Sequence, residues 1–264
     1  MGLLELPYTE QSPSIAARMT KLAPYLLLLL CGLMACAEPV RAYTEDFPPF
    51  NTLNEQGQPS GYAVELLGLL MKEAQQEYRL ELVPWARALS NARQQPGSLI
   101  FTIARTPERE PHFHWIGPIA ARSTAMMRLR DGPARASNLQ EAKAYKVGVI
   151  NGDAGMELLL SHGFVRGVNL VPLDKRNDLV RLLQLGSLDF IVASPTLIQY
   201  VASRAGIRPD QLEISLTLLR QPEGFYFALN KQSDPALLQR LQAAFERLQA
   251  REAVDQLKRK HAIE

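Results

Sequence analysis

Arg109 is the side chain whose type and place best suit binding chemistry. It stands in the polar turn TPERE, a few residues after the apolar run 99–104 (LIFTIA). A guanidinium stays charged at any relevant pH, and its rigid fork pairs two donors with the two oxygens of a carboxylate. The alternative is a surface arginine neutralised by Glu108 or Glu110. The flanking pattern favours a ligand role.

His112 and His114 form the other pattern that suggests chemistry. Two such side chains point the same way from an extended strand, but no cysteine, acid or third histidine follows at a metal-ligand spacing. We therefore expect a structural role for both. The sequence also has no serine nucleophile elbow, glycine-rich phosphate loop or zinc-finger spacing. These patterns predict neither a metal nor a cofactor, and no enzymatic activity.

The run 99–104 must position Arg109. Its continuous apolar side chains indicate a parallel strand in a sheet that helices cover on both faces. Pro107 restricts Thr106 to extended conformations, and threonine is a good N-cap, so a short helical turn is predicted at the carboxyl end of this strand. Open α/β sheets bind their ligands at that end.

The rest of the chain repeats a strand–helix rhythm, which predicts parallel strands with helical crossovers. A first unit has strands at 40–43, 80–83 and 99–104 and helices at 61–78 and 85–93. The strand 120–129 is expected to leave this unit before a breaker at 131–133. A second unit has strands at 146–150, 169–173 and 189–193 and helices at 156–162, 177–185 and 195–205. The segment 214–219 returns as a second hinge, 225–229 adds a strand, and 235–261 forms one closing helix.

The run FTIARTPERE followed by WIGPI resembles the type-3 extracellular solute-binding proteins, the receptors of polar amino-acid ABC transporters. The resemblance extends over residues 40–261. It implies an α/β, two-lobed periplasmic binding protein fold, with two doubly wound domains joined by two hinge strands. Lobe 1 would then comprise 38–125 plus 220–264, and lobe 2 would comprise 126–219.

The resemblance also implies a ligand site. In this family the arginine of the turn clamps the ligand's α-carboxylate, which assigns that role to Arg109. An aromatic residue after the first strand stacks on the ligand, and Phe47 matches it. Thr102 and the loop from Gly152 to Gly155 would be hydrogen-bond partners. Trp85 follows Pro84 where a strand is expected to meet a helix, so it would form a wall of the site or pack in the core.

Two positions depart from the family pattern. Asp153 replaces a hydroxyl in the loop, where it either caps its own helix or faces a positive ligand group. Ser194 stands where amino-acid binders place an aspartate for the ligand's ammonium, and a hydroxyl carries no compensating charge. The ligand is then a carboxylate without that amine, a modified amino acid or short peptide, or an amine that reaches Asp153 or Asp174.

The expected function is capture of a small carboxylate-bearing ligand by hinge closure, and its delivery to an ABC permease in the inner membrane. We expect a monomer. One alternative is a sensor that reports the ligand to a membrane signalling protein. Another is a periplasmic enzyme of the cyclohexadienyl dehydratase type. Ser194 and the absence of an evident cleft glutamate argue against that enzyme.

The first residues predict export. An apolar stretch at 22–34 ends in Ala35-Cys36-Ala37, the layout of a signal peptide cleaved after residue 37 within a leader 1–37, and Met19 is its predicted start. Acylation of Cys36 as a lipoprotein is the alternative. Both cysteines of the chain lie in this leader, so the mature protein can form no internal disulfide. The localisation predicted is the periplasm.

The charge balance argues against nucleic acid as a partner. The chain has 29 basic and 27 acidic residues, a formal net charge of +2, and the two signs are interspersed. Even the run 258–260 stands at a helix end, where cations suit the helix dipole. The partners expected are therefore a small molecule and a membrane protein.

Overall fold

A computed structural model describes residues 38–263, and residues 38–264 form one compact unit. Eight strands form one sheet in the order β4-β1-β5-β10-β6-β9-β7-β8, and β2 and β3 form a separate hairpin. The strands are β1 (Val40–Thr44), β2 (Thr52–Leu53), β3 (Pro59–Ser60), β4 (Tyr78–Leu82), β5 (Ser98–Ala104), β6 (Phe113–Leu129), β7 (Val147–Ile150), β8 (Leu170–Leu173), β9 (Phe190–Ala193) and β10 (Leu212–Asn230).

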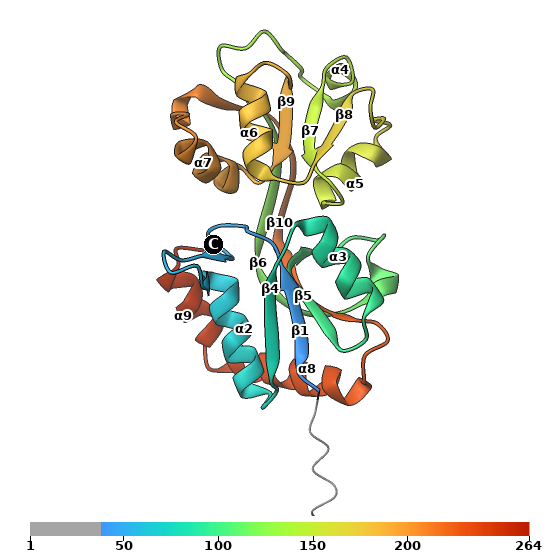
Figure 1. The fold of residues 1–264 in the computed structure, drawn as a ribbon, viewed down its shortest axis with the longest axis vertical. Coiled ribbons are helices and arrows are strands. Elements are labelled where there is room, and N and C mark those ends of the chain that lie inside the picture. The colour runs from blue at the N-terminus through green and yellow to red at the C-terminus, as the bar shows by residue number, and fades with distance from the viewer. Residues whose placement is uncertain (1–37, 264) are drawn as a thin grey trace, which may run out of the picture. The chain divides into compact units, whose positions relative to one another are not determined.

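Helices cover the sheet in two groups (Figure 1). With β1, β4 and β5 lie α2 (Tyr62–Glu73), α3 (Trp85–Gln94), α8 (Pro235–Ala250) and α9 (Ala253–Lys260). With β7, β8 and β9 lie α4 (Leu139–Ala142), α5 (Ala154–Ser161), α6 (Arg176–Gln184) and α7 (Pro195–Arg204). Two 3₁₀ turns, Glu110–His112 and Pro209–Gln211, complete the elements. These two groups are the lobes, and the predicted fold class is confirmed.

Two long strands, β6 and β10, join the lobes and pair antiparallel along most of their length (Figure 1). The expected strand 120–129 is wrong at its start, because β6 begins at Phe113. The expected hinge at 214–219 and strand at 225–229 are one continuous strand, β10. Bulges shift the register between these strands. The two strands therefore stay paired through polar and proline-containing stretches, where the sequence pattern predicts that a strand ends. The domain limits at 126 and 219 stay predictions.

The closing helix 235–261 is wrong as a single element. It breaks after α8 at Arg251, and Glu252 has a φ of 57°, a left-handed conformation that ends one helix before α9 begins.

The turn after β5 also differs in detail. Backbone N–H groups of Arg109 and Glu110 donate to the Thr106 carbonyl, but the Thr106 side chain caps no helix and donates to Glu157 instead.

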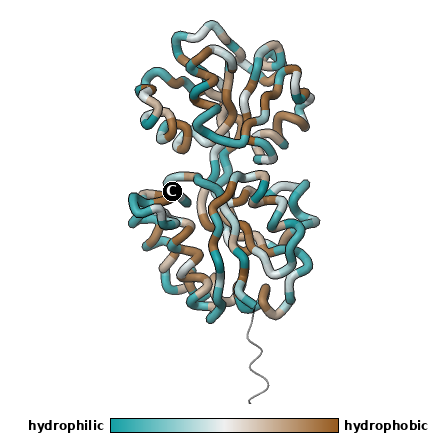
Figure 2. The backbone as a smooth tube through the Cα atoms, in the orientation of Figure 1, coloured by the Kyte–Doolittle hydropathy of each residue, from teal (hydrophilic) through white to brown (hydrophobic). Residues whose placement is uncertain are grey.

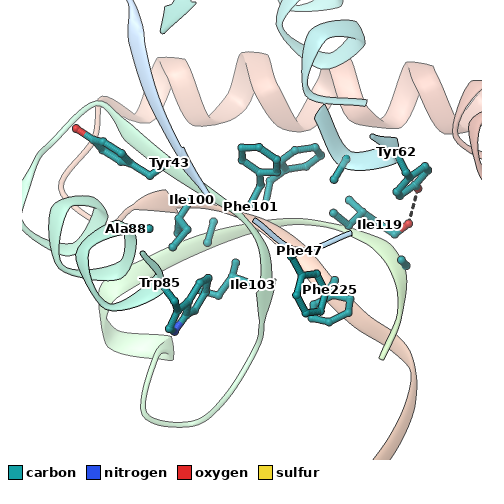
Figure 3. Packing of buried hydrophobic residues seen from close by; sticks show 14 of the residues in the cluster. Tyr43, Phe47, Tyr62, Trp85, Ala88, Ile100, Phe101, Ile103, Ile119 and Phe225 are labelled. Carbon is teal, nitrogen blue, oxygen red and sulfur yellow. Dashed lines mark hydrogen bonds between the residues drawn. The ribbon is translucent and has the colours of Figure 1, made fainter. Parts of the chain in front are cut away.

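Hydrophobic residues, in brown, follow the strands inside each lobe, while the tube between the lobes is mostly teal, the colour of hydrophilic residues (Figure 2). In lobe 1, β5 is buried along its whole length, as its apolar sequence predicts. Figure 3 shows Phe47 against Phe225, and the Tyr62 hydroxyl donating to the Ile119 carbonyl. A second core cluster, with Val149 and Phe190, fills lobe 2.

Gly224 lets β10 approach β6 beside Arg122. A Cβ atom at position 224 would lie 2.6 Å from the Arg122 amide nitrogen and closer still to its Cβ. Because backbone atoms cannot give way as a side-chain tip can, we expect Gly224→Ala to reduce the free energy of unfolding by about 1–3 kcal/mol. Chemical denaturation measures this. Gly68→Ala is the control for glycine loss alone, because its φ is not positive and its Cβ would meet only the Tyr78 hydroxyl, at 3.5 Å; an equal effect of both changes would contradict the steric account.

Several predictions fall outside these elements. The leader, with its cleavage and acylation sites, lies outside the described residues. Within residues 38–263, no helix is both long and apolar enough to cross a membrane, and no group of three potential metal ligands occurs. His114 instead lies on β6, 3.5 Å from the Lys231 amine.

Candidate functional site

A cavity of about 60 Å³ lies between the lobes, at the carboxyl ends of β1, β5, β7 and β9. Six of the seven predicted site residues line it, and the seventh, Gly152, contacts two of them. The lining side chains that carry polar or aromatic chemistry are Glu45, Phe47, Trp85, Thr102, Arg109, Arg122, Ser123, Thr124, Asp153, Arg176, Ser194 and Phe225.

Arg109 is 1% exposed and joins the lobes through Glu157 of α5. Its Nε and Nη2 donate to Glu157 Oε1 at 3.0 and 2.8 Å, and its Nη1 donates to the Ala104 carbonyl at 3.1 Å. Burial lowers the pKa of Arg109, and Glu157 opposes that shift. Neither Glu108 nor Glu110 neutralises Arg109, and Glu110 pairs with Arg105 instead. The alternative of a surface arginine neutralised by a neighbouring glutamate is therefore wrong.

Trp85 and Gly152 form a second contact between the lobes. The Trp85 indole N–H donates to the Gly152 carbonyl at 2.8 Å, and Arg109 Nη2 donates to the same oxygen at 3.1 Å. The Arg109 guanidinium also lies 5.3 Å from the centre of the Trp85 ring, a cation–π distance. Gly152 has φ of +72°, which suits glycine. Its carbonyl therefore faces lobe 1, whereas the prediction was an N–H donor from this loop.

Phe47 connects the cavity to a third interlobe contact. It stacks on Phe50 at 5.4 Å, and the Arg176 guanidinium lies 4.9 Å from its ring. Arg176, at the start of α6, pairs with Glu45 in the loop after β1. Burial raises the pKa of Glu45, although Arg176 lowers it. Phe47 is thus both core and cavity wall, and Phe50 is half-buried against the same core.

Thr102 stands in strained backbone inside β5. Its φ is 56°, and it has no partner in the pairing of β5 with β10, where Ile103 and Phe101 face consecutive residues. A β-branched residue rarely adopts this conformation, which is typical of functional sites. Its hydroxyl donates to Asn51 Oδ1 at 2.6 Å, so this proton is already used, and only acceptor capacity remains for a ligand.

Asp153 caps α5, one of the two roles that the sequence left open. Its Oδ1 accepts the Met156 N–H at 2.7 Å. It also lines the cavity, where burial raises its pKa while Arg176, Arg109 and Arg122 lower it. The Asp153 side chain therefore both caps α5 and forms part of the cavity wall.

The raised pKa of Asp153 predicts a pH effect on stability. The folded state holds this proton to a higher pH than the unfolded state, so its contribution is complete below the ordinary aspartate pKa of about 4 and is lost as pH rises through the folded value. Asp153→Asn keeps an N-cap and removes that loss. We expect its thermal midpoint to exceed that of the unchanged protein near pH 7 and to match it near pH 4. Equal midpoints at both pH values would contradict this.

Arg122, on β6, has no ion-pair partner among residues 38–263. Its side chain is 8% exposed, and its one hydrogen bond is a 3.5 Å contact from Nη1 to Gln221 Oε1. Burial lowers its pKa to about 10. Sequence reasoning missed it, because an arginine in a strand gives no sign of its burial.

Ser194 precedes α7 and lines the cavity, but its side chain makes no cap hydrogen bond. Glu45 also lines the cavity, and Glu157 lies at its edge on Arg109, so the expected absence of a cleft glutamate is wrong. Both acids were missed because their partners lie far along the chain. Of the acids that line the cavity, Asp153 alone gave a sequence signal, through its departure from the family pattern.

The model of the bacterial extracellular solute-binding proteins, family 3, matches residues 40–264. The chain belongs to this family. The predicted resemblance is therefore confirmed, and the cavity lies in a fold whose members bind solutes outside the cell. Among curated proteins nothing matches the chain.

Solved structures share this fold at low sequence identity. A histidine kinase sensor domain with similarity to periplasmic binding proteins is 21% identical, with a TM-score of 0.74 over 85% of this chain and 96% of that one. A mutant of ArgBP from T. maritima is 20% identical, with a TM-score of 0.71 over 84% and 94%. The arginine-, lysine-, histidine-binding protein ArtJ from Geobacillus stearothermophilus is 18% identical, with a TM-score of 0.70 over 85% and 95%. At these identities they bear on the fold of this solute-binding protein alone.

Proposed function

We propose that this protein captures a small carboxylate-bearing ligand between its lobes in the periplasm and delivers it to an ABC permease. One observation carries the proposal: three guanidinium groups, those of Arg109, Arg122 and Arg176, line a single cavity between two lobes that the strands β6 and β10 connect. Such a site suits an anion that closes the lobes around itself. No residue in this proposal performs a reaction, so the protein acts as a binding protein and not as an enzyme.

We propose that the ligand contacts the residues that the sequence singled out. The hydrogen bonds that these residues can offer differ from those predicted. Phe47 and Trp85 form walls, and Thr102 and Ser194 offer hydroxyl oxygens. Arg109 retains one N–H on Nη1 for a ligand, because its other donors already face Glu157, Ala104 and Gly152. The clamp proposed for it is therefore partial as long as Glu157 stays in place.

Thermal unfolding of residues 38–264 against amino acids, dipeptides, polyamines and simple carboxylates tests the binding role. A ligand at about 100 times its Kd adds about 2.7 kcal/mol to stability, which corresponds to a rise of about 5–10 °C at this size. A decrease in the radius of gyration with the same ligand would support hinge closure. If no member of the panel moves the midpoint, the proposal fails for these classes. Ligand uptake by cells with and without the protein tests delivery.

A second candidate function is a sensor that reports the ligand to a membrane signalling protein. The similarity to a histidine kinase sensor domain supports it. The two functions share the cavity and differ in the partner of the closed form. Unchanged uptake in cells that lack the protein, together with a lost transcriptional response to the ligand, would favour the sensor.

A further inference from the structure

The two edge strands of the eight-stranded sheet differ in the backbone groups that they leave free. At one edge, Leu170 and Pro172 are the residues of β8 that face away from β7. The N–H of Leu170 donates to the Val165 carbonyl, and the Leu170 carbonyl accepts the Gly167 N–H, both at 3.1 Å. Pro172 has no N–H. This edge therefore offers a further strand no free N–H at either position.

The other edge, β4, is open along its length. Backbone hydrogen bonds turn residues 77, 79, 81 and 83 toward β1. The residues between them, Tyr78, Leu80 and Leu82, therefore point their N–H and C=O groups away from the sheet. Within the described part of the chain, 38–263, these groups have no hydrogen-bond partner. A row of free backbone groups of this kind is a template for another strand.

The side chains of β4 make the strand complementary to a second copy of itself. When two β4 strands lie antiparallel about Leu80, Arg79 of each copy is directly opposite Glu81 of the other. Tyr78 is then opposite Leu82. Arg79 and Glu81 are exposed, and neither has an ion-pair partner among the residues that the structure describes. Opposite charges that face each other across two strands stabilise the pairing.

This register has advantages over the neighbouring ones. A two-fold pairing about Arg79 or Glu81 would place like charges directly opposite each other, which destabilises a sheet. A pairing about Tyr78 or Leu82 would align most of β4 with residues outside the strand of the second copy. The pairing about Leu80 aligns all of β4 with all of its counterpart. Backbone, charge and strand length therefore favour the same arrangement.

We propose that two copies of this chain form a dimer through β4, with a two-fold axis at Leu80 that joins their sheets into one. Each outward-facing residue then donates one backbone hydrogen bond to the other copy and accepts one from it. A groove of about 410 Å³ lies at this edge, lined by Gly68, Met71 and Tyr78 among others. Leu82 of the second copy, opposite Tyr78 on the same face, covers apolar surface beside the groove.

The proposed interface belongs to lobe 1 alone. It leaves β6 and β10, which connect the lobes, unchanged, so each copy keeps its own cavity. The inference is therefore independent of the ligand and goes beyond the proposed function. It replaces the monomer that we expect from the sequence, where nothing shows that β4 lies at a sheet edge.

Sedimentation equilibrium of residues 38–264, which form one compact unit, tests the dimer. We expect the average mass to rise with protein concentration toward that of two chains. Over the same range, hydrogen exchange should slow at the amides of Tyr78, Leu80 and Leu82, because pairing removes them from water. A mass of one chain at every concentration up to about 0.3 mM overturns the proposal. So does a dimer in which exchange at 78–82 is unchanged, since another surface then forms it.

Charge reversal tests the register about Leu80. Arg79→Glu and Glu81→Arg each place two like-charged pairs across the axis, so each should weaken dimerisation by about 10-fold or more. The double variant restores opposite charges and should dimerise within about 3-fold of the unchanged protein. A mixture of the two single variants should form mixed dimers for the same reason. A double variant as weak as the single ones overturns this pairing.

Arg166→Glu is the matched control, because it makes the same change at an exposed arginine beside β8, at the opposite edge of the sheet. It should leave the dimer unchanged, and a loss equal to that of Arg79→Glu overturns the assignment to β4. Since Arg79 and Glu81 are exposed, all these variants should keep the circular dichroism spectrum and the thermal midpoint of the unchanged chain.

Discussion

Glu157→Ala should open the cleft of this protein. The change removes the carboxylate that pairs with Arg109, whose side chain is 1% exposed, whereas the side chain of Glu157 is 14% exposed. Removing one partner of a buried pair costs about 3–5 kcal/mol, since the other charge stays buried without compensation. Because the pair joins two lobes, the molecule can relieve this cost by separating them and letting water reach Arg109. The expected result is a larger radius of gyration in small-angle scattering.

The double variant Arg109→Met with Glu157→Ala is the control for lost contact. It removes both charges, so no uncompensated group remains, and we expect a scattering curve closer to that of the unchanged protein. Thr106, which donates to Glu157 at 3.1 Å, loses its partner in both variants and so cancels in the comparison. An unchanged radius for Glu157→Ala would show that this pair does not hold the lobes together.

Arg122→Met should stabilise the ligand-free protein. Burial lowers the pKa of Arg122 to about 10, which corresponds to about 3 kcal/mol by which burial disfavours its charged form. Methionine fills a similar volume without a charge, and such replacements of buried charges stabilise proteins by about 1–4 kcal/mol. For a chain of this size the thermal midpoint would rise by about 2–16 °C.

Arg109→Met is the matched comparison, because it removes a buried arginine that does have a carboxylate partner. It leaves Glu157 without its cation and should lower the midpoint, so the two changes of the same residue type have opposite signs. Arg122→Met should also remove the response to any anionic ligand. A fall in the midpoint for Arg122→Met would mean that Gln221 and the hinge compensate this guanidinium well enough, and the proposed ligand site would lose part of its support.

The sequence by itself determined the fold class and singled out six of the residues that line the candidate cavity. Buried strands and amphipathic helices have different periods, and Pro107 ends β5 at the edge where α/β sheets bind ligands, so β5, its turn and Arg109 could be located locally. The seven predicted site residues gather at one cavity for the same reason. The predicted ends of strands were wrong where pairing with another strand outweighs the local sequence pattern. In β10, for example, the polar middle of the strand still pairs with β6.

Tertiary structure alone decided which charges meet. Arg109 and its partner Glu157 are 48 residues apart, and Arg176 and Glu45 are 131 residues apart, so no spacing along the chain relates them. Whether an arginine is compensated depends on which carboxylates the fold brings within hydrogen-bond reach. That is why Arg109, the predicted clamp, already donates to Glu157, while Arg122, without any sequence signal, is the cavity arginine that no ion pair within residues 38–263 compensates.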